Sequence, residues 1–304
     1  MALNLESGVQ SLRKEVVDSM VKQVAARTYK FKQAVAVVST NAWKNTFFRE
    51  DLTVLAGRSG NSQKGIPRGA NFPQRTAKWE EVSVRIVKHG LEDNINIEDI
   101  ISDEINIQAR TIIRLTEGVV KSVDDDIWNQ LTQANLTTDV AGEGDNIKIQ
   151  SFAISNLADG GSWNESSAAI IDNLMKASQL IHTNGNYDVS DLMCFVSPRD
   201  KRSIMKYLAD KGAQWQPIAT DIANNGKIAK VAGITIVESN SVSTSYALVV
   251  KPKTCATWKT LVPLKSTTIE DPFKSVKIRV TESGAVELTD PKAIVLIKNT
   301  QQGV

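Results

Sequence analysis

The stretch from Arg58 to Lys78, RSGNSQKGIPRGANFPQRTAK, constrains the fold of this chain more than any other. It contains three glycines, two prolines and five basic residues but no acidic residue, and only Ile66 and Phe72 are large and apolar. Fixing the backbone of one residue costs about 1–2 kcal/mol, and this stretch has too little apolar surface to offset that cost. We expect residues 58–75 to be disordered in a free chain and to become ordered only against another surface.

The composition is that of an ordinary globular protein. The 304 residues suffice for one large domain or two smaller ones, and a hydrophobic content of 41% and a charged content of 23% are typical. A net charge of +2 is too small to indicate a nucleic-acid-binding protein by itself. The two cysteines, Cys194 and Cys255, match no metal-ligand spacing and no disulfide framework, which favours a reducing compartment.

No segment of the sequence resembles a membrane anchor or a secretion signal. Apolar runs such as Tyr246–Val250 and Ala293–Ile297 are much shorter than the roughly 20 residues of a membrane helix. The first ten residues, MALNLESGVQ, lack the basic and then apolar profile of a signal peptide. We therefore expect no contact with a membrane.

The N-terminal segment has a helical period. From Gln10 to about Val38, Leu12, Val16, Met20, Val24 and Ala25 are apolar and charged residues lie between them. The segment is net basic, so it forms either a solvated helix face or a contact with an acidic partner.

Two predicted strands flank the polar stretch. One covers Phe47 to Ala56, and the other covers Trp79 to Val87, where Val82, Val84 and Ile86 alternate with polar residues. Together they predict an extended hairpin with a tip longer than an ordinary hairpin loop of about 2–5 residues.

A long amphipathic helix is predicted next. Ser102 is suited to the N-cap position, and Asp103 and Glu104 are acidic residues in a first turn. About thirty residues at ~1.5 Å each give a rod of roughly 45 Å. The expected apolar stripe consists of Ile105, Ala109, Ile112, Ile113, Val119, Val120, Val123, Ile127 and Leu131.

The second half of the chain reads as mixed α/β. Helices are predicted over Ser167–Thr183 and from Pro198, with Gly212 beyond the end of the second. Predicted strands are the buried segment Asp191–Ser197, VAGITIVESNSV, YALVVKP, SVKIRV, AVEL and KAIVLI.

The sequence shows no catalytic constellation. His89 and His182 have no partner at ligand spacing, and we interpret both as surface or satisfied histidines. No phosphate-binding loop or nucleophile elbow is present. Asp124 to Asp126 could hold a hard cation, but one exposed helix face is the preferred interpretation. We expect no catalytic residue, no cofactor and no metal.

The order of these elements resembles the major capsid proteins of tailed bacteriophages, which have the Hong Kong 97-type fold. The passages that carry the resemblance are KWEEVSVRIVKHGLEDNINIEDI followed by DDDIWNQL, then MCFVSPRDKRSIMKYLADKG, and finally VAGITIVESNSV with ELTDPKAIVLI. The resemblance covers nearly the whole chain.

The resemblance implies an α+β fold with segments of distinct roles. These are an N-terminal arm (1–46), an extension loop formed by the hairpin (47–92), a peripheral domain with the long spine helix (93–149), an axial domain (150–261), and strands that return mainly to the peripheral domain (262–304). On this basis the polar stretch would be buried against a neighbouring subunit.

The resemblance also implies a structural, non-enzymatic protein of the virion capsid. Copies of the chain would assemble in the host cytoplasm into hexamers and pentamers of an icosahedral shell around double-stranded DNA, which they contact non-specifically. Portal, scaffolding and decoration proteins are further implied partners. Only an arm and the loop precede the spine helix, so scaffolding is a separate protein or a removed segment, and Met1 favours the former. Lys64 lies in the loop tip, but no partner asparagine or acid is recognisable, so crosslinking is not inferred.

Two alternatives remain open. An encapsulin, a cellular compartment that holds a cargo enzyme, has the same fold, although the long loop tip speaks against it. An α/β enzyme with an unrecognised site belongs to a different class.

The charges suggest how copies would meet. The basic residues of the loop have no acidic residue in their own segment, and an acidic cluster lies around the start of the spine helix. We expect these two sets to face each other across a subunit interface. The sets are Arg58, Lys64, Arg68, Arg75 and Lys78 on the loop, and Glu98, Asp99, Asp103 and Glu104 on the partner.

Overall fold

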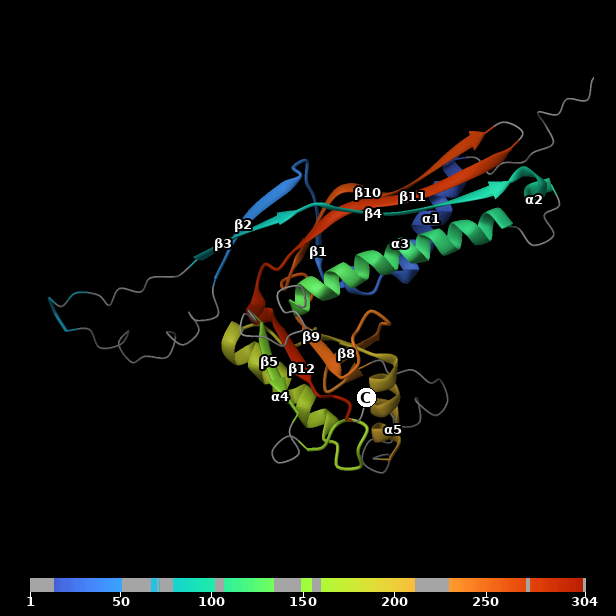
Figure 1. Ribbon diagram of the computed structural model, residues 1–304. Coiled ribbons are helices and arrows are strands. Elements are labelled where there is room, and N and C mark those ends of the chain that lie inside the picture. The colour runs from blue at the N-terminus through green and yellow to red at the C-terminus, as the bar shows by residue number, and fades with distance from the viewer. Residues whose placement is uncertain are drawn as a thin grey trace, which may run out of the picture.

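The computed structural model describes residues 14–50, 67–69, 71, 79–101, 107–133, 149–154, 160–210, 230–271 and 274–302. Over these residues the chain forms a four-stranded sheet with helices α1 and α3 beside it, and a six-stranded sheet with helices α4 and α5. A two-stranded ribbon projects from the first unit (Figure 1). None of the described helices is long and apolar enough to cross a membrane.

Helix α1 spans Lys14–Thr28 and ends ten residues before the predicted limit. A short 3-10 helix, Phe31–Gln33, follows, and then strand β1, Ala36–Ser39, pairs in parallel with β10. The prediction of helix as far as Val38 was wrong, because the backbone of residues 36–39 makes its hydrogen bonds with β10 instead of within a helix. The buried face consists of Val17, Val21 and Ala25, so of these only Ala25 was among the predicted apolar positions, and the predicted Val16 is exposed.

The predicted hairpin is confirmed at its base. Strand β2, Lys44–Glu50, pairs antiparallel with β3, Trp79–Arg85, in a register that places Lys44 opposite Arg85. The first strand begins three residues earlier than predicted. Most of the tip lies outside the described residues.

The spine helix is α3, Ile107–Thr132, preceded by β4, Val87–Asn96, and the short helix α2, Ile97–Ile101. Its 26 residues give a rod of about 39 Å. The predicted N-cap Ser102 lies outside the described residues. Most of the predicted stripe is buried, but Ile113 is exposed.

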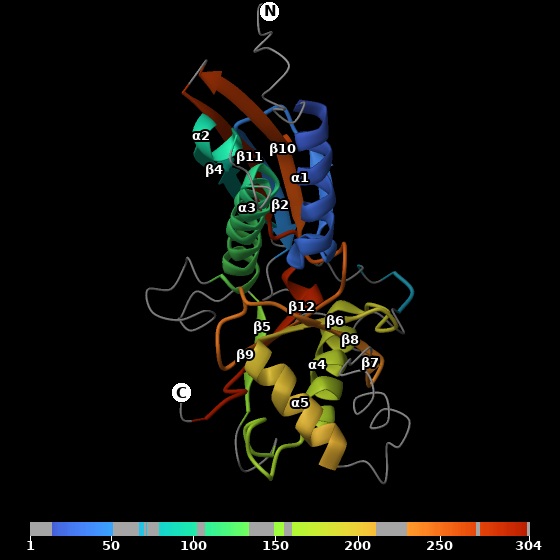
Figure 2. The ribbon, with the colours of Figure 1, turned by 90° about the vertical axis from the view of Figure 1, so that its right-hand side faces the viewer.

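The four-stranded sheet has the order β1-β10-β11-β4. Strand β10, Thr257–Asp271, was not predicted, and the two segments SVKIRV and AVEL belong to one long strand, β11, Ser275–Glu287. Helix α3 packs against β11 and β4, and α1 packs against α3 and β10 (Figures 1 and 2). The boundary expected at residue 261 lies inside β10.

The six-stranded sheet is mixed, with the order β5-β12-β9-β6-β8-β7. Its strands are β5 Gln150–Ala153, β12 Ile294–Lys298, β9 Tyr246–Val250, β6 Met193–Val196, β8 Ile234–Glu238 and β7 Lys230–Val231. One face packs with α4, Ile170–Gly185, and α5, Pro198–Asp210, through residues such as Cys194 and Val249. The other face, which includes Leu248 and Leu296, belongs to the core of the first unit.

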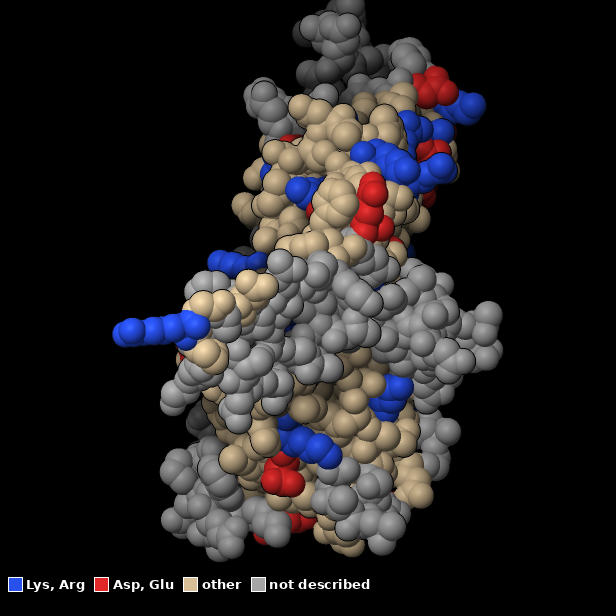
Figure 3. Space-filling view, turned by 90° about the vertical axis from the view of Figure 1, so that its left-hand side faces the viewer, with Lys and Arg blue, Asp and Glu red and all other residues tan. Residues whose placement is uncertain are grey.

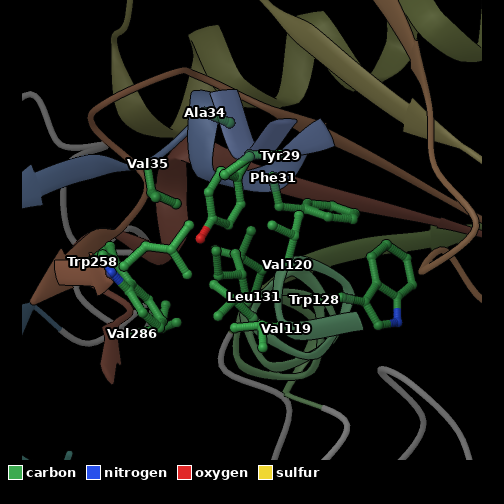
Figure 4. Close-up of a cluster of buried hydrophobic side chains, with 14 of the residues drawn as sticks. Tyr29, Phe31, Ala34, Val35, Val119, Val120, Trp128, Leu131, Trp258 and Val286 are labelled. Atoms are coloured by element: carbon green, nitrogen blue, oxygen red, sulfur yellow. The ribbon is translucent and has the colours of Figure 1, made fainter. Parts of the chain in front are cut away.

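Phe31 joins the two units. Its ring is fully buried and stacks on Phe195 of β6, with ring centroids 4.3 Å apart, and lies 5.7 Å from Trp128 of α3. Figure 4 shows Tyr29 and Phe31 facing side chains of α3. The interior is therefore continuous from the spine helix to the second sheet.

Candidate assembly surfaces

The ribbon β2–β3 exposes large apolar side chains. Phe48 and Trp79 are 62% and 60% exposed. The register pairs Phe48 with Glu81 and Glu50 with Trp79, so both aromatic rings lie on the same face of the ribbon as diagonal neighbours. An isolated two-stranded ribbon is marginally stable in water. A face of this kind is suited to burial against another chain.

The same end of the chain exposes further apolar residues. Trp43, just before β2, and Val37 and Val38 on β1 are exposed. Strand β1 lies at the edge of the four-stranded sheet and pairs only with β10 among the described strands. The sequence analysis did not predict that these apolar side chains are exposed, although for Phe48 the sequence contains a signal. Phe47 and Phe48 are adjacent in a strand, so they must point to opposite faces.

A buried polar cluster ties the segment after α1 to the long sheet. Glu282 on β11 is fully buried, and its carboxylate accepts hydrogen bonds from the Tyr29 hydroxyl and the Lys32 ammonium. The ammonium also lies over the Tyr29 ring, 4.4 Å from its centroid. Burial, and then the nearby Glu282 carboxylate, raise the pKa of Tyr29 well above its usual range, so the hydroxyl remains a donor.

The prediction that Asp124 of α3 lies on an exposed helix face is wrong. Asp124 is 3% exposed, and its Oδ2 accepts a hydrogen bond of 2.8 Å from the backbone N–H of Lys30. Burial raises the pKa of Asp124 to about 6, although backbone N–H groups of residues 30–32 oppose the rise. The carboxylate thus caps the start of the 3-10 helix, a contact that sequence spacing could not reveal.

His89 lies in the interior and not on the surface. Its Nδ1 lies 2.9 Å from Ser122 Oγ, and its Nε2 lies 4.0 Å from Asp126 Oδ2. Burial raises the pKa of Asp126, and His89 opposes the rise. His182 has a partner as well, since its Nδ1 lies 2.9 Å from the backbone oxygen of Tyr187.

The predicted charge pairing falls largely outside the described residues. Arg68, Glu98 and Asp99 are described and exposed. The remaining members are not: Arg58, Lys64, Arg75 and Lys78 of the loop, and Asp103 and Glu104 of the acidic cluster. Strand β4, about 33 Å long for its ten residues, separates the ribbon from α2, and the two lie at opposite ends of the molecule (Figure 1).

Elsewhere the surface carries mixed charges. On the outer face of the four-stranded sheet, Arg279 Nη2 lies 2.7 Å from Glu92 Oε2. In the upper part of Figure 3, basic and acidic side chains lie next to one another. Among the described residues no three His, Cys, Asp or Glu side chains are grouped to hold a metal ion. Cys194 and Cys255 are free and buried.

One groove lies between the two units. It has a volume of about 700 Å³ and is lined by α3, the segment around Lys30 and the loop after β8. Lys201 and Glu238 form an ion pair of 2.6 Å at its wall. Its charged residues of both signs show no nucleophile paired with a base, so the groove does not suggest an enzyme site.

The comparisons with known proteins agree with this architecture. Residues 79–297 match the model of a family described as phage capsid protein, while no curated protein matches the sequence. Solved structures that share the fold include the capsid of the cyanophage P-SCSP1u (15% identity, TM-score 0.59, 89% of this chain and 88% of the other). The mature capsid of bacteriophage PhiM1 gives 15% identity, a TM-score of 0.59, and coverage of 90% and 88%. A virus-like particle from Pyrococcus furiosus gives 11% identity and a TM-score of 0.59, and the match covers 95% of this chain and 100% of the other.

These matches confirm the predicted resemblance to the Hong Kong 97-type fold. The family match spans well over half of the chain, from the second strand of the ribbon to the last strand of the second sheet. A structural role in a virion capsid follows from that membership. The chain belongs to the phage capsid protein family.

Proposed function

We propose that this chain is the major subunit of an icosahedral shell, and that it assembles as hexamers and pentamers around double-stranded DNA. The observation that carries the proposal is the projecting ribbon, which exposes Phe48 and Trp79 on one face and reaches away from the rest of the chain (Figure 1). In a shell this face would be buried on the next subunit, and the apolar area removed from water would offset the ordering of the loop, at roughly 25 cal/mol/Å².

The segments would then take the roles that the resemblance implies. Residues 47–92 would be the extension loop, 93–149 with α3 the peripheral domain, and 150 to about 256 the axial domain. Of the strands that follow, β10 and β11 would complete the peripheral domain and β12 the axial domain. The arm, 1–46, contacts neighbouring subunits or DNA with its first residues, while α1 already uses Val17 and Val21 within its own chain. Portal, scaffolding and decoration proteins would join the shell in the host cytoplasm.

Electron microscopy of the purified, concentrated protein tests the proposal. The expected result is closed shells with pentameric and hexameric clusters. A protein that stays monomeric over a wide range of concentration and salt would refute it.

A second function is favoured by one comparison. The particle from Pyrococcus furiosus is matched over its entire chain, which supports a cellular compartment of the encapsulin type. The contents of purified shells separate the two proposals. Phage-length DNA supports the viral capsid, and a protein cargo without DNA supports the compartment.

A further inference from the structure

Helix α5 carries a stripe of basic residues on its outward face. Arg199, Arg202 and Lys206 are all exposed. Their spacing of three and four residues places them on one side of the helix, opposite the buried Ile204 and Leu208. Figure 2 shows α5 in front of the second sheet, so this side faces away from the core.

These three side chains make no ion pair within the described part of the chain, in contrast to Lys201 of the same helix. Lys201 Nζ lies 2.6 Å from Glu238 Oε2. Glu165 and Asp210 line the same groove as the stripe, yet neither lies within 4.0 Å of a stripe nitrogen among the described ion pairs. The stripe therefore presents unneutralised charge.

The stripe works against the stability of its own helix. Arg199 lies in the first turn, where the helix dipole favours acidic residues, and Arg202 and Lys206 are like charges one turn apart. The start of the helix is stabilised by other groups, because Ser197 Oγ accepts the N–H of Asp200 at 3.2 Å and donates to its carboxylate at 2.7 Å. The stripe is thus not explained by the folding of α5.

A groove of about 530 Å³ runs beside the stripe. Trp163 lines it, and the buried indole N–H of Trp163 has no hydrogen-bond partner among the described residues. Tyr207 and Gln301 supply further polar groups. Gln301 Nε2 already donates to Asp200 Oδ1 and to Ser203 Oγ. The exposed cations of the stripe fit a partner that offers acceptors and negative charge.

We propose that the outward face of α5 binds the phosphate backbone of double-stranded nucleic acid. From Arg199 to Lys206 the stripe extends about 10 Å, which corresponds to three steps of ~3.4 Å rise and therefore to about four successive phosphates of one strand. The stripe includes a lysine, a residue that is depleted in protein interfaces. It fits a contact that positions the duplex and does not read its sequence. This inference rests on the proposed function, because it gives the shell a contact with its contents.

The test compares two variants of equal charge. R199Q/R202Q/K206Q removes the stripe, and K88Q/K265Q/K277Q removes three basic residues from the outer face of the four-stranded sheet. Full-length protein, below the concentration at which it assembles, is titrated into a fluorescent duplex of about 30 base pairs at roughly 50 to 200 mM salt, and anisotropy is recorded.

We expect the stripe variant to bind the duplex roughly 10-fold or more weakly, with a salt slope smaller by about 2 to 3, because about three phosphate contacts are lost. The control variant should bind within about twofold of the wild type. Equal losses in both variants, no loss in either, or no binding by the wild type would overturn the inference.

Electron microscopy of all three proteins distinguishes this inference from the proposed function. If only the stripe variant fails to form shells, α5 contacts a second copy and the inference is overturned while the function stands. If the wild type forms no shells but binds DNA through the stripe, the shell proposal fails and the DNA contact is supported.

Discussion

The Tyr29 hydroxyl donates a hydrogen bond to the carboxylate of Glu282, which is 253 residues further along the chain. With Lys32 as the second donor, this contact fastens the segment after α1 to the middle of β11. The Glu282 carboxylate is fully buried, so these two hydrogen bonds compensate for the water that the carboxylate loses on folding.

Replacing Glu282 by Ala should lower the free energy of unfolding of the subunit by about 3 kcal/mol, because the Lys32 ammonium then loses its counterion in a mostly buried site. Tyr29→Phe removes one hydrogen bond to the same carboxylate and should cost about 1–3 kcal/mol. Urea unfolding followed by circular dichroism measures both. Glu92→Ala, which breaks the exposed pair with Arg279, is the control and should leave the midpoint unchanged. Equal midpoints for Glu282→Ala and the control would show that the cluster adds nothing to stability.

The burial of Asp124 predicts a pH dependence with a definite sign. In the folded chain its pKa is raised to about 6 from the ordinary value of 3.8. The folded state therefore retains a proton that the unfolded state releases, and stability falls as the pH rises through this window. Asp124→Asn cannot ionise, so its stability relative to the wild type should improve between pH 4 and pH 7, by up to about 3 kcal/mol.

Asp188→Asn is a control of opposite sign for this experiment. Hydrogen bonds from Ser190 lower the pKa of Asp188, so ionisation favours the folded state and its contribution is lost as the pH falls. Unfolding free energies at several pH values measure both variants. A difference for Asp124→Asn that stays constant with pH would contradict the prediction.

The sequence predicted those elements whose own pattern is regular. The alternation of Val82 and Val84 located the ribbon, and the stripe that ends at Leu131 located the spine helix. Strand β10 was missed because its register shifts between Thr260 and Val262 and again before Lys265, which destroys the period of two.

The polar cluster could not be predicted for a different reason. The contacts of Glu282 and Asp124 depend on how distant segments pack, and neither residue has a partner at a fixed spacing. A charged residue in an alternating strand and an acidic run in a helix both look exposed until the surrounding elements are placed. The Hong Kong 97-type resemblance rested on the order of elements, which does not depend on such contacts.

The exposed aromatic residues of the ribbon should matter for assembly and not for the fold. We expect Phe48→Ser with Trp79→Ser to leave the unfolding midpoint of the subunit unchanged and to raise the concentration needed for assembly roughly 10-fold, because one or two anchors of the interface are lost. Phe31→Ala is the contrasting variant. It empties the space between Phe195 and Trp128 and should cost about 3–5 kcal/mol of subunit stability. Light scattering against concentration measures assembly, and normal assembly of the double variant would remove the ribbon face from the interface.

The last prediction concerns the charges of the loop. Arg68 and the other basic residues of the loop have no acidic residue in their own segment. Glu98 and Asp99 are exposed on α2, at the end of β4 that lies away from the ribbon (Figure 1). Exposed pairs contribute only about 0–1 kcal/mol each, so their main effect should be on register and assembly rate, repeated around a closed ring. We predict that Arg68→Glu with Arg75→Glu slows or misdirects assembly, and that adding Glu98→Lys with Asp103→Lys partly restores it.

Stopped-flow light scattering at several salt concentrations measures this rate. Raised salt should slow assembly of the wild type and reduce the difference between wild type and variant, because screening weakens the attraction that the variant has lost. The acidic-to-basic changes alone should also slow assembly, since they leave the loop facing like charge. If the reversed loop assembles at the wild-type rate at low salt, charge complementarity has no role, and the loop is held by backbone pairing and by apolar contacts such as those of Phe48.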